Sequence, residues 1–404
     1  MANKDFDANK YLELAKSLKL DSMDDINDLF KNLSKAIIEN SLNAEMDEHL
    51  GYDKWDQTSR LKSNNYRKGY SNKKVKSSFG EFDIKIPRDE EALFEPQLIK
   101  KYQTDISHFD DKVISLYSKG LSTREIENYI KELYNVELSK DTIARITDKI
   151  LPEINEWLER PIEEVYPVIY IDGIRFKVKE DNRFVEKSVY ILFGINTNGI
   201  KNVLHFSIAE SESAKQWLTI FNQLKEKGLK DVLIFCCDNL SGISEAIKSA
   251  FPNAMVQKCI IHQIRNSNKF VRYDDLKEFT KDMKKIYQSS SLELALKALE
   301  EFSEKWNNKY NYAIKSWNQN IEELTTFFNF PKELRKLIYT TNSIENLNRN
   351  IRKLTKTKNG FCTINSLKKM IYFSILNQSK NWDKRIQNWG IIYNQLKILF
   401  DDRI

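Results

Sequence analysis

The chain has 404 residues, more than one ordinary hydrophobic core accommodates and enough for two or three domains. Hydrophobic residues make up 41% of it, which argues against large-scale disorder, and the net charge of +6 is too small to indicate a nucleic-acid partner by itself. No run approaches the ~18 uncharged apolar residues of a membrane span, the N-terminal segment lacks the apolar run of a signal peptide, and the four cysteines show no disulfide spacing. We therefore expect a cytoplasmic protein without a membrane partner.

The N-terminal part combines a helical region with a basic module. Apolar residues at helical spacing predict helical structure over residues 1–54. The stretch Arg60–Lys76 then contains many cations and no acid, and the alternation in 82–86 predicts a strand that Pro87 ends. Residues 55–105 are therefore predicted to form a small basic β-containing module that binds DNA. The lysines expected to contact phosphates are Lys68, Lys73 and Lys74.

Residues 106–160 predict three short helices joined by tight turns. Gly120 ends the first, Ser122 and Glu125 have the capping-box pattern that opens the second, and Ser139 caps the third. The pattern is typical of a helix-turn-helix DNA-binding unit, although a plain helical bundle would give a similar one. In a helix-turn-helix, the residues near the start of the third helix would approach DNA: Lys140, Thr142 and Arg145.

From Tyr166 onward, strand and helix patterns follow the order β-β-β-α-β-α-β. This order predicts a mixed sheet, with an antiparallel meander followed by parallel strands that crossover helices connect. Residues 270–335 contain no strand pattern and predict an all-helical insertion. We therefore expect an α+β domain built from residues 161–269 and 336–404, with helical structure from about Thr341 to the end.

Two carboxylates follow apolar strand sequences. Asp172 comes after Val168–Ile171 and is expected to end the first strand, and Asp238 comes after Val232–Cys237 and is expected to end the fourth. Ligands gather at strand ends in open α/β sheets, and a carboxylate after an apolar run needs hydrogen bonds, water or a cation. Two such carboxylates on neighbouring strands would repel one another unless a cation lay between them.

A third acid, Glu345, lies near the start of a helical segment with one basic face. Positions i, i+4, i+7 and i+11 of a helix fall on one stripe. One such stripe starts at Glu345. The cations on it or beside it are Arg349, Arg352, Lys353 and Lys356. This arrangement suits a metal ligand followed by a track for a phosphate backbone.

Three carboxylates from separate elements suit phosphodiester chemistry. Two divalent cations ~3.5–4 Å apart activate a water or 3′-hydroxyl and stabilise the leaving oxygen, and carboxylate oxygens hold Mg²⁺. We hypothesise two Mg²⁺ (or Mn²⁺) ions, with Asp172 as the bridging ligand and with Asp238 and Glu345 each completing one site.

Each acid also has a simpler interpretation. Asp172-Gly173 is a hairpin-turn signal, Asp238 could cap the helix that follows it, and Glu345 could pair with Arg349. The three acids together, in this order of strands and helices, are a more specific signal than any one of them.

The chain resembles the Mutator-type family of bacterial insertion-sequence transposases over essentially its whole length. The segments that carry the resemblance are Tyr170–Arg175, Cys237–Gly242, Lys258–Asn266 and Tyr339–Asn346, with shorter ones at 44–52, 86–89, 94–99 and 119–126. The resemblance implies a ribonuclease-H-like catalytic domain whose DDE triad is Asp172, Asp238 and Glu345. It also implies a protein of the bacterial cytoplasm, at the nucleoid, that joins the terminal inverted repeats of its element to target DNA. Because two ends must be brought together, we expect a homodimer or higher oligomer on DNA.

Cys259 and His262 match a pair that the family carries after its fifth strand. The resemblance implies that they support the triad, by orienting a carboxylate or contacting DNA, whereas the simpler interpretation is a buried Cys and a satisfied core His. A zinc site is not favoured, because the other Cys and His residues are scattered singly. In the helical insertion, Trp306, Trp317 and Tyr310 are expected to be mostly core, with stacking on an unpaired base as the alternative.

Two other functions remain open. A ribonuclease-H-like nuclease without strand transfer would share the chemistry and the three acids. A transcriptional regulator with a catalytically dead domain would instead bind DNA regardless of these acids and would need no metal.

Overall fold

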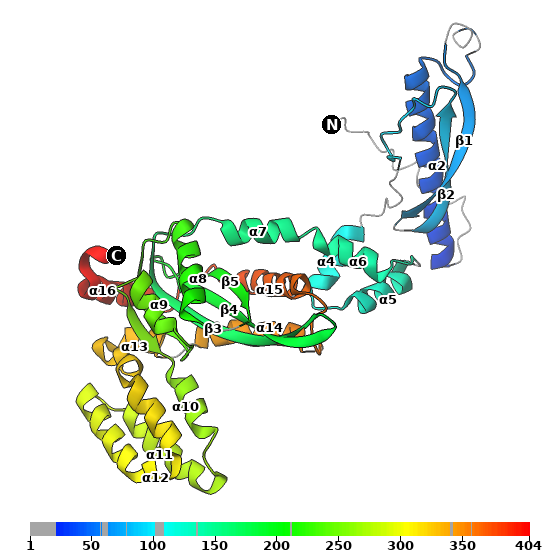
Figure 1. The fold of residues 1–404 in the computed structure, drawn as a ribbon. Helices are drawn as coiled ribbons and strands as arrows, with labels where there is room; N and C mark the ends of the chain where they lie inside the picture. Colours follow the sequence, from blue (N-terminus) through cyan, green and yellow to red (C-terminus); the bar gives the residue numbers. More distant parts are fainter. Residues whose placement is uncertain are drawn as a thin grey trace. The chain divides into compact units, whose positions relative to one another are not determined.

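The computed structural model describes residues 22–56, 58, 64–77, 79–101, 109–134, 136–210, 212–339, 342–356 and 358–404. These residues form two compact units, one ending at Asp148 and the other beginning at Lys149 (Figure 1). Helices and strands are mixed, as the α+β prediction requires. The helical structure predicted before Ser22 lies outside the described residues. None of the described helices is both long and apolar enough to cross a bilayer.

The first unit contains a long helix packed on a β-hairpin. The elements are α2 (Met23–Leu50), β1 (Arg67–Ser77) and β2 (Gly80–Asp89). The hydroxyl of Ser22 caps α2 by accepting from the backbone N–H of Asp25 at 3.1 Å. The small core between helix and hairpin consists of Leu42, Val75, Phe82, Ile84 and Ile99. The predicted helix and the predicted β-containing module thus share one core.

The hairpin differs from the prediction in two respects. Much of the basic stretch forms strand β1, which the sequence pattern did not predict. Pro87 does not end β2, because it pairs with Tyr70 and the strand continues to Asp89. In a two-stranded sheet each strand has an outer edge, and a Pro whose missing N–H faces that edge removes no ladder hydrogen bond.

The three predicted short helices are present as α4 (Phe109–Ser118), α5 (Thr123–Tyr134) and α6 (Lys140–Asp148). The capping box is formed: the Ser122 N–H donates to the Glu125 carboxylate at 2.6 Å, and the Glu125 N–H donates to the Ser122 hydroxyl at 3.2 Å. Ser139 caps α6 through the N–H of Thr142 at 3.2 Å. The helix boundaries are therefore confirmed, while DNA binding by these helices stays a prediction.

The second unit is built on a five-stranded mixed sheet in the order β5-β4-β3-β6-β7. The strands are β3 (Val165–Glu180), β4 (Arg183–Ile195), β5 (Lys201–Ala209), β6 (Asp231–Cys237) and β7 (Met255–Lys258). The first three form an antiparallel meander, and β6 and β7 run parallel to β3, as predicted. The crossover helices are α8 (Ala214–Glu226) and α9 (Ile243–Ala250), which share a core with one face of the sheet.

Strand β3 does not end at Asp172. It continues to Glu180, and the hairpin turn lies at Asp181 and Asn182, whose φ angles are 45° and 65°. The turn interpretation of Asp172-Gly173 is therefore wrong. The parallel partner β6 does end there, because Ile171 pairs with Cys237, the last residue of β6. Asp172 is thus the first residue of β3 beyond its pairing with β6.

The rest of the second unit is helical. They are α7 (Leu151–Glu159), α10 (Ile260–Asn268), α11 (Tyr273–Tyr287), α12 (Leu292–Leu324), α13 (Lys332–Ile338), α14 (Asn342–Thr355), α15 (Ile364–Ser379) and α16 (Trp389–Phe400), with short 3-10 turns η1 (Thr326–Asn329) and η2 (Asp401–Arg403). Residues 270–335, all of which the structure describes, contain no strand, as predicted. Figure 1 shows α11 and α12 side by side, and α12 also contacts β7.

A buried histidine on β5 gives the unit a pH dependence. His205 is 8% exposed, and its burial together with the neighbouring cations Lys227, Arg160 and Lys368 lowers its pKa to about 3. Between that value and the usual 6.5, the unfolded chain binds a proton that the folded chain does not. Folding stability contributed by the neutral imidazole is therefore lost as the pH falls from 6.5 toward 3.

We expect His205→Leu to reduce the slope of the unfolding free energy against pH by about 1 kcal/mol per pH unit below pH 6.5. Urea unfolding at pH 6.5, 5.5 and 4.5, followed by tryptophan fluorescence, measures this slope for the wild type and for His205→Leu. Other titrating groups are the same in both, so they cancel in the comparison. Parallel stability curves for the two proteins would contradict the assignment.

Candidate active site

Asp172 and Asp238 are neighbours because of the pairing between β3 and β6. Each follows directly after the paired residues Ile171 and Cys237. Asp238 begins the loop to α9 but does not cap that helix, whose N-cap position is Gly242. Gly242 has a φ of 72°, and a Cβ on it would lie 2.6 Å from a backbone nitrogen of α8. The loop after Asp238 therefore requires a glycine at this position.

The Asp172 carboxylate is buried and held by two hydrogen bonds. It is 7% exposed and accepts from the N–H of Gly173 at 2.8 Å and from the Nδ2 of Asn348 at 2.5 Å. Burial raises the pKa of Asp172, and the nearby charge of Asp238 acts in the same direction. Asn348 lies on α14 and was not predicted, although its i+3 spacing from Glu345 places it on the same side of the helix.

His262 lies between the other two acids. It is on the first turn of α10, with its Nδ1 3.8 Å from Asp238 Oδ2 and its Nε2 3.7 Å from Glu345 Oε1. Burial opposes its protonation, but contact with the Cys259 thiol and the charges of Asp238 and Asp172 raise the pKa of His262 to about 9. The imidazole of His262 is therefore protonated on both nitrogens and positively charged at neutral pH, next to the carboxylates.

The three predicted acids converge around His262 in two overlapping groups. Ligand atoms of Asp172, Asp238 and His262 lie within 4.8 Å of one another, as do those of Cys259, His262 and Glu345. Glu345 therefore does not form one tight group with the two aspartates. His262 is the residue that the two groups share. The largely apolar run over residues 254–261 has a strand pattern, but β7 ends at Lys258 and Cys259 is the N-cap of α10.

Glu345 has a cationic partner that the sequence did not indicate. Arg265 Nη1 lies 3.2 Å from Glu345 Oε1, whereas Arg349 donates to the side chain of Asn346. The alternative pairing of Glu345 with Arg349 is therefore wrong. Arg265 is one helical turn from His262 on α10, and this i+3 spacing was the available signal.

The basic face of α14 is exposed, as predicted. The helix turns Ile344, Leu347 and Ile351 toward the interior, and all three are fully buried. The predicted phosphate-contacting residues on its outer side are all exposed: Arg349, Arg352, Lys353 and Lys356.

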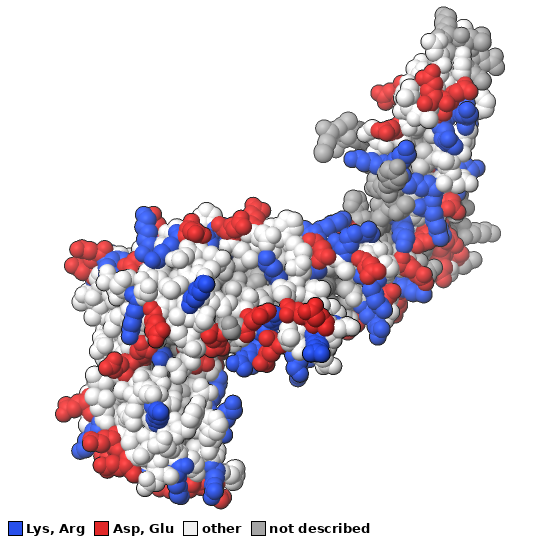
Figure 2. Space-filling model, in the orientation of Figure 1, with Lys and Arg blue, Asp and Glu red and all other residues white. Residues whose placement is uncertain are grey.

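The DNA-binding candidates of the first unit are in part paired. Lys74 lies 2.7 Å from Glu81 and Lys68 lies 3.8 Å from Glu90, while Lys73 donates to two backbone carbonyls. On α6, Lys140 and Arg145 are exposed and Thr142 is partly buried. Figure 2 shows Lys and Arg mixed with acids over the visible face of this unit. These pairings partly neutralise the basic module.

The aromatic residues singled out in the insertion are mainly core. Trp317 is fully buried and Trp306 nearly so, which excludes both from stacking on a base. Tyr310 donates its hydroxyl to Asp275 at 2.6 Å. The stacking alternative is therefore wrong for the two tryptophans.

Comparison with known proteins confirms the predicted family. The model of the family described as "Transposase, Mutator family" matches residues 7–385. The chain belongs to the Mutator family of transposases. The probable transposase for the ISRM3-like element of Sinorhizobium fredii and the transposase for ISRM3 of Rhizobium meliloti are each 37% identical to it, over 93% of both chains. The transposase for IS1201 of Lactobacillus helveticus is 31% identical, over 86% of this chain and 93% of the relative.

The matched range of this Mutator-family transposase contains the whole candidate site. It includes Asp172, Asp238 and Glu345, the supporting Cys259 and His262, and all the predicted DNA contacts. Helix α16 lies beyond it.

Proposed function

We propose that the protein is an insertion-sequence transposase that binds the ends of its element and cuts and joins DNA strands. Asp172, Asp238 and Glu345 serve as its DDE triad. The observation that carries the proposal is the convergence of these three acids around His262 in a chain of this family. We further propose a ribonuclease-H-like catalytic domain, which is supported by the antiparallel meander, the two following parallel strands, and acids on the first strand and just after the fourth.

The donor set fits Mg²⁺ or Mn²⁺. All three acids offer hard oxygen ligands, and the carboxylates of Asp238 and Glu345 are each about a quarter exposed, which leaves access from solvent. Two such ions, when bound, activate the attacking water or 3′-hydroxyl and stabilise the leaving oxygen. Asp172 is the proposed bridging ligand, since hydrogen bonds from Gly173 and Asn348 already fix both of its oxygens.

The other residues of the site orient these ligands and DNA. His262 and Arg265 both lie beside Oε1 of Glu345 and bring positive charge to the place where a scissile phosphate would lie. The exposed cations of α14 lead away from Glu345 along one side of the helix. They are the proposed track for the phosphate backbone of the element end.

Removing two cations of this track should lower the salt dependence of DNA binding. Each phosphate contact contributes about 0.9 to the slope of log affinity against log salt, so Arg352→Gln combined with Lys356→Gln should reduce the slope by about 2. Fluorescence anisotropy with end DNA at several salt concentrations measures it. Lys305→Gln is the control, because Lys305 is paired with Glu278 and Asp282. Equal slopes for the double variant and wild type would remove α14 from the DNA interface.

Incubation of the protein with labelled element-end DNA, target DNA and Mg²⁺ or Mn²⁺ tests the function itself. Cut and joined products are expected. Cutting without joining would favour the nuclease, and binding without cutting would favour the regulator. Light scattering of the same complex should give at least two protein chains per pair of ends.

A further inference from the structure

Strand β7 is a short element on which the candidate site depends. It has four residues, it is the last strand of the sheet, and Cys259 and the first turn of α10 follow it directly. Any shift of β7 would therefore move His262, which bridges Asp238 and Glu345. One edge of β7 pairs with β6, and the other edge needs a different support.

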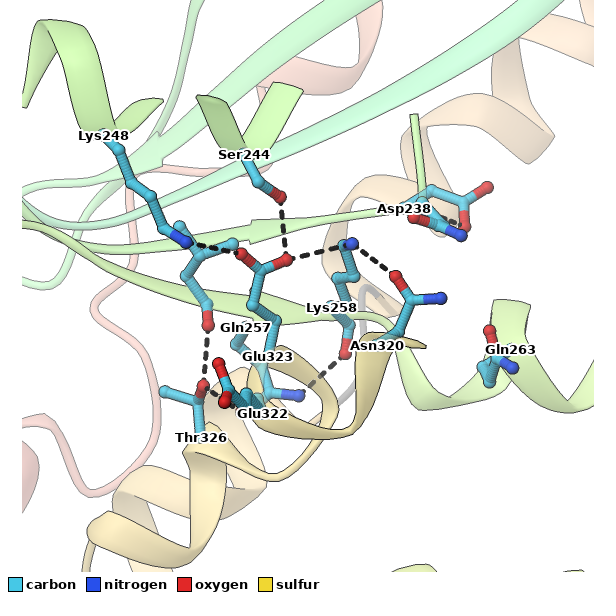
Figure 3. Close-up of polar contacts among 12 residues, drawn as sticks. Asp238, Ser244, Lys248, Gln257, Lys258, Gln263, Asn320, Glu322, Glu323 and Thr326 are labelled. Atoms are coloured by element: carbon cyan, nitrogen blue, oxygen red, sulfur yellow. Dashed lines mark hydrogen bonds and ion pairs between the residues drawn. The ribbon is translucent and has the colours of Figure 1, made fainter. Parts of the chain in front are cut away.

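The end of the helical insertion supplies that support. Thr326 Oγ1 donates to the carbonyl of Val256 at 2.7 Å, and the N–H of Phe327 donates to Gln257 Oε1 at 2.7 Å. Gln257 is fully buried, and its Nε2 donates to the carbonyl of Leu324 at 3.0 Å. Figure 3 shows Gln257 and Thr326 in this region, where the chain leaves α12. The outer edge of β7 is thus covered by the insertion.

The last residue of β7 makes a nearly buried ion pair with α12. Lys258 Nζ lies 2.9 Å from Glu323 Oε2 and donates to Asn320 Oδ1 at 2.6 Å (Figure 3). Glu323 also accepts from the hydroxyl of Ser244 on α9 at 2.8 Å, and its other oxygen lies 3.4 Å from Lys248. One carboxylate therefore links the insertion to β7 and to α9.

The same part of α12 also contacts α10. Gln263 donates to the Ser316 hydroxyl at 3.0 Å, and the indole N–H of Trp317 donates to the Ser267 hydroxyl at 3.0 Å. Tyr310 has non-helical angles (φ −133°, ψ 45°), and this kink separates the contacting part from the part of α12 nearer its start. The segment after the kink therefore lies against both β7 and α10.

We propose that the Lys258–Glu323 pair is a positioning device, through which the segment of α12 after the kink fixes His262 beside the candidate triad. A buried ion pair contributes little net stability compared with an apolar pair of similar size, but it constrains geometry. Catalytic groups must be held to within about 0.5 Å, so this constraint affects the reaction rate. The catalytic part of the proposal rests on the proposed function.

The test separates positioning from stability. Lys258→Met and Glu323→Leu each leave one buried charge, so both should lower the melting temperature and the cleavage rate. Their combination should recover the melting temperature, whereas the cleavage rate at saturating DNA should stay at least about tenfold low, with KM within about twofold of wild type. Lys248→Met is the matched control, because Lys248 lies on α9, is largely exposed and faces the other oxygen of the same carboxylate. A double variant that regains both stability and rate would overturn the proposal.

A second measurement does not need cleavage. The ring signals of His262 in a histidine-labelled protein, identified with His262→Gln, should move or broaden in the double variant and stay unchanged in Lys248→Met. Unchanged signals in the double variant would overturn the positioning role. If the wild type did not cut DNA at all, the proposed function would fail, while the ring signals would still test whether the pair positions His262.

Discussion

Replacing any one of Asp172, Asp238 and Glu345 by its amide should reduce strand cleavage by at least about 10³-fold, which corresponds to about 4 kcal/mol of activation free energy. The amide keeps the size of the side chain but loses the charge that holds a divalent cation. At Asp172, the oxygen of an Asn could still accept from the N–H of Gly173, and its NH₂ could donate to the oxygen of Asn348 once the Asn348 amide is turned over, so the backbone around it should not move. The fold and the affinity for end DNA should therefore be retained.

Cleavage of labelled end DNA in Mg²⁺ and in Mn²⁺, together with DNA affinity and circular dichroism, measures these effects. Asp181→Asn is the control, because Asp181 is an exposed acid in the turn of the same β3–β4 hairpin and Asn accepts its positive φ. Full cutting by one of the three amide variants would remove that residue from the triad. Loss of cutting in the control would show that the hairpin itself is sensitive.

Trp217→Ala should cost about 3–5 kcal/mol of folding stability, the usual range for a buried aromatic residue. Trp217 on α8 is 1% exposed, and its ring contacts Tyr190 edge to face with centroids 4.5 Å apart. Its indole N–H donates to the carbonyl of Ser241, in the loop that follows Asp238. Truncation therefore opens a cavity between helix and sheet and also releases that loop.

Urea unfolding with constant m-values measures the loss. Tyr273→Ala is the control, since Tyr273 is 90% exposed in the same unit and its removal should change stability by no more than about 0.5 kcal/mol. A loss below about 1 kcal/mol for Trp217→Ala would mean that the core between α8 and the sheet can rearrange.

The order of the strands was predictable because apolar runs alternate with clear helical segments. Strand β6 covers the apolar run that its sequence indicates, together with Asp231 before it, and ends one residue before Asp238. The continuation of β3 beyond Asp172 was missed because the Asp-Gly pair is a local turn signal. That signal is overridden by packing with a distant residue: Phe176 contacts Phe361 edge to face, with ring centroids 5.7 Å apart.

The candidate site was predictable only where a local pattern marks it. The three acids follow apolar runs or begin a basic helical face, and the family resemblance indicated Cys259 and His262. The contacts of Asn348 with Asp172 and of Arg265 with Glu345 join residues more than 75 positions apart. Lys258 and Glu323 are likewise distant, and no periodicity in the sequence connects them. The apolar residues after Cys259 fit a buried strand as well as a buried helix face, so the sequence alone does not show that β7 ends at Lys258.

The β3–β4 hairpin determines where the basic helix lies. In the middle of α14, Asn348 binds Asp172. Beyond the C-terminal end of the helix, the N–H of Phe361 donates to the carbonyl of Lys177, and the N–H of Lys179 donates to the carbonyl of Phe361, both at 2.8 Å. The chain can approach the hairpin this closely because position 360 is a glycine. Two anchors on one strand, about 20 Å apart at 3.3 Å per residue, thus hold the second half of α14, about 10 Å long, and the segment that joins it to Phe361. A hairpin shortened by one residue pair beyond Val178 would keep both anchors. A hairpin shortened further would lose the anchor at Phe361. The distal cations of α14 would then no longer be held at a fixed position relative to the acids, although Asp172 would not move.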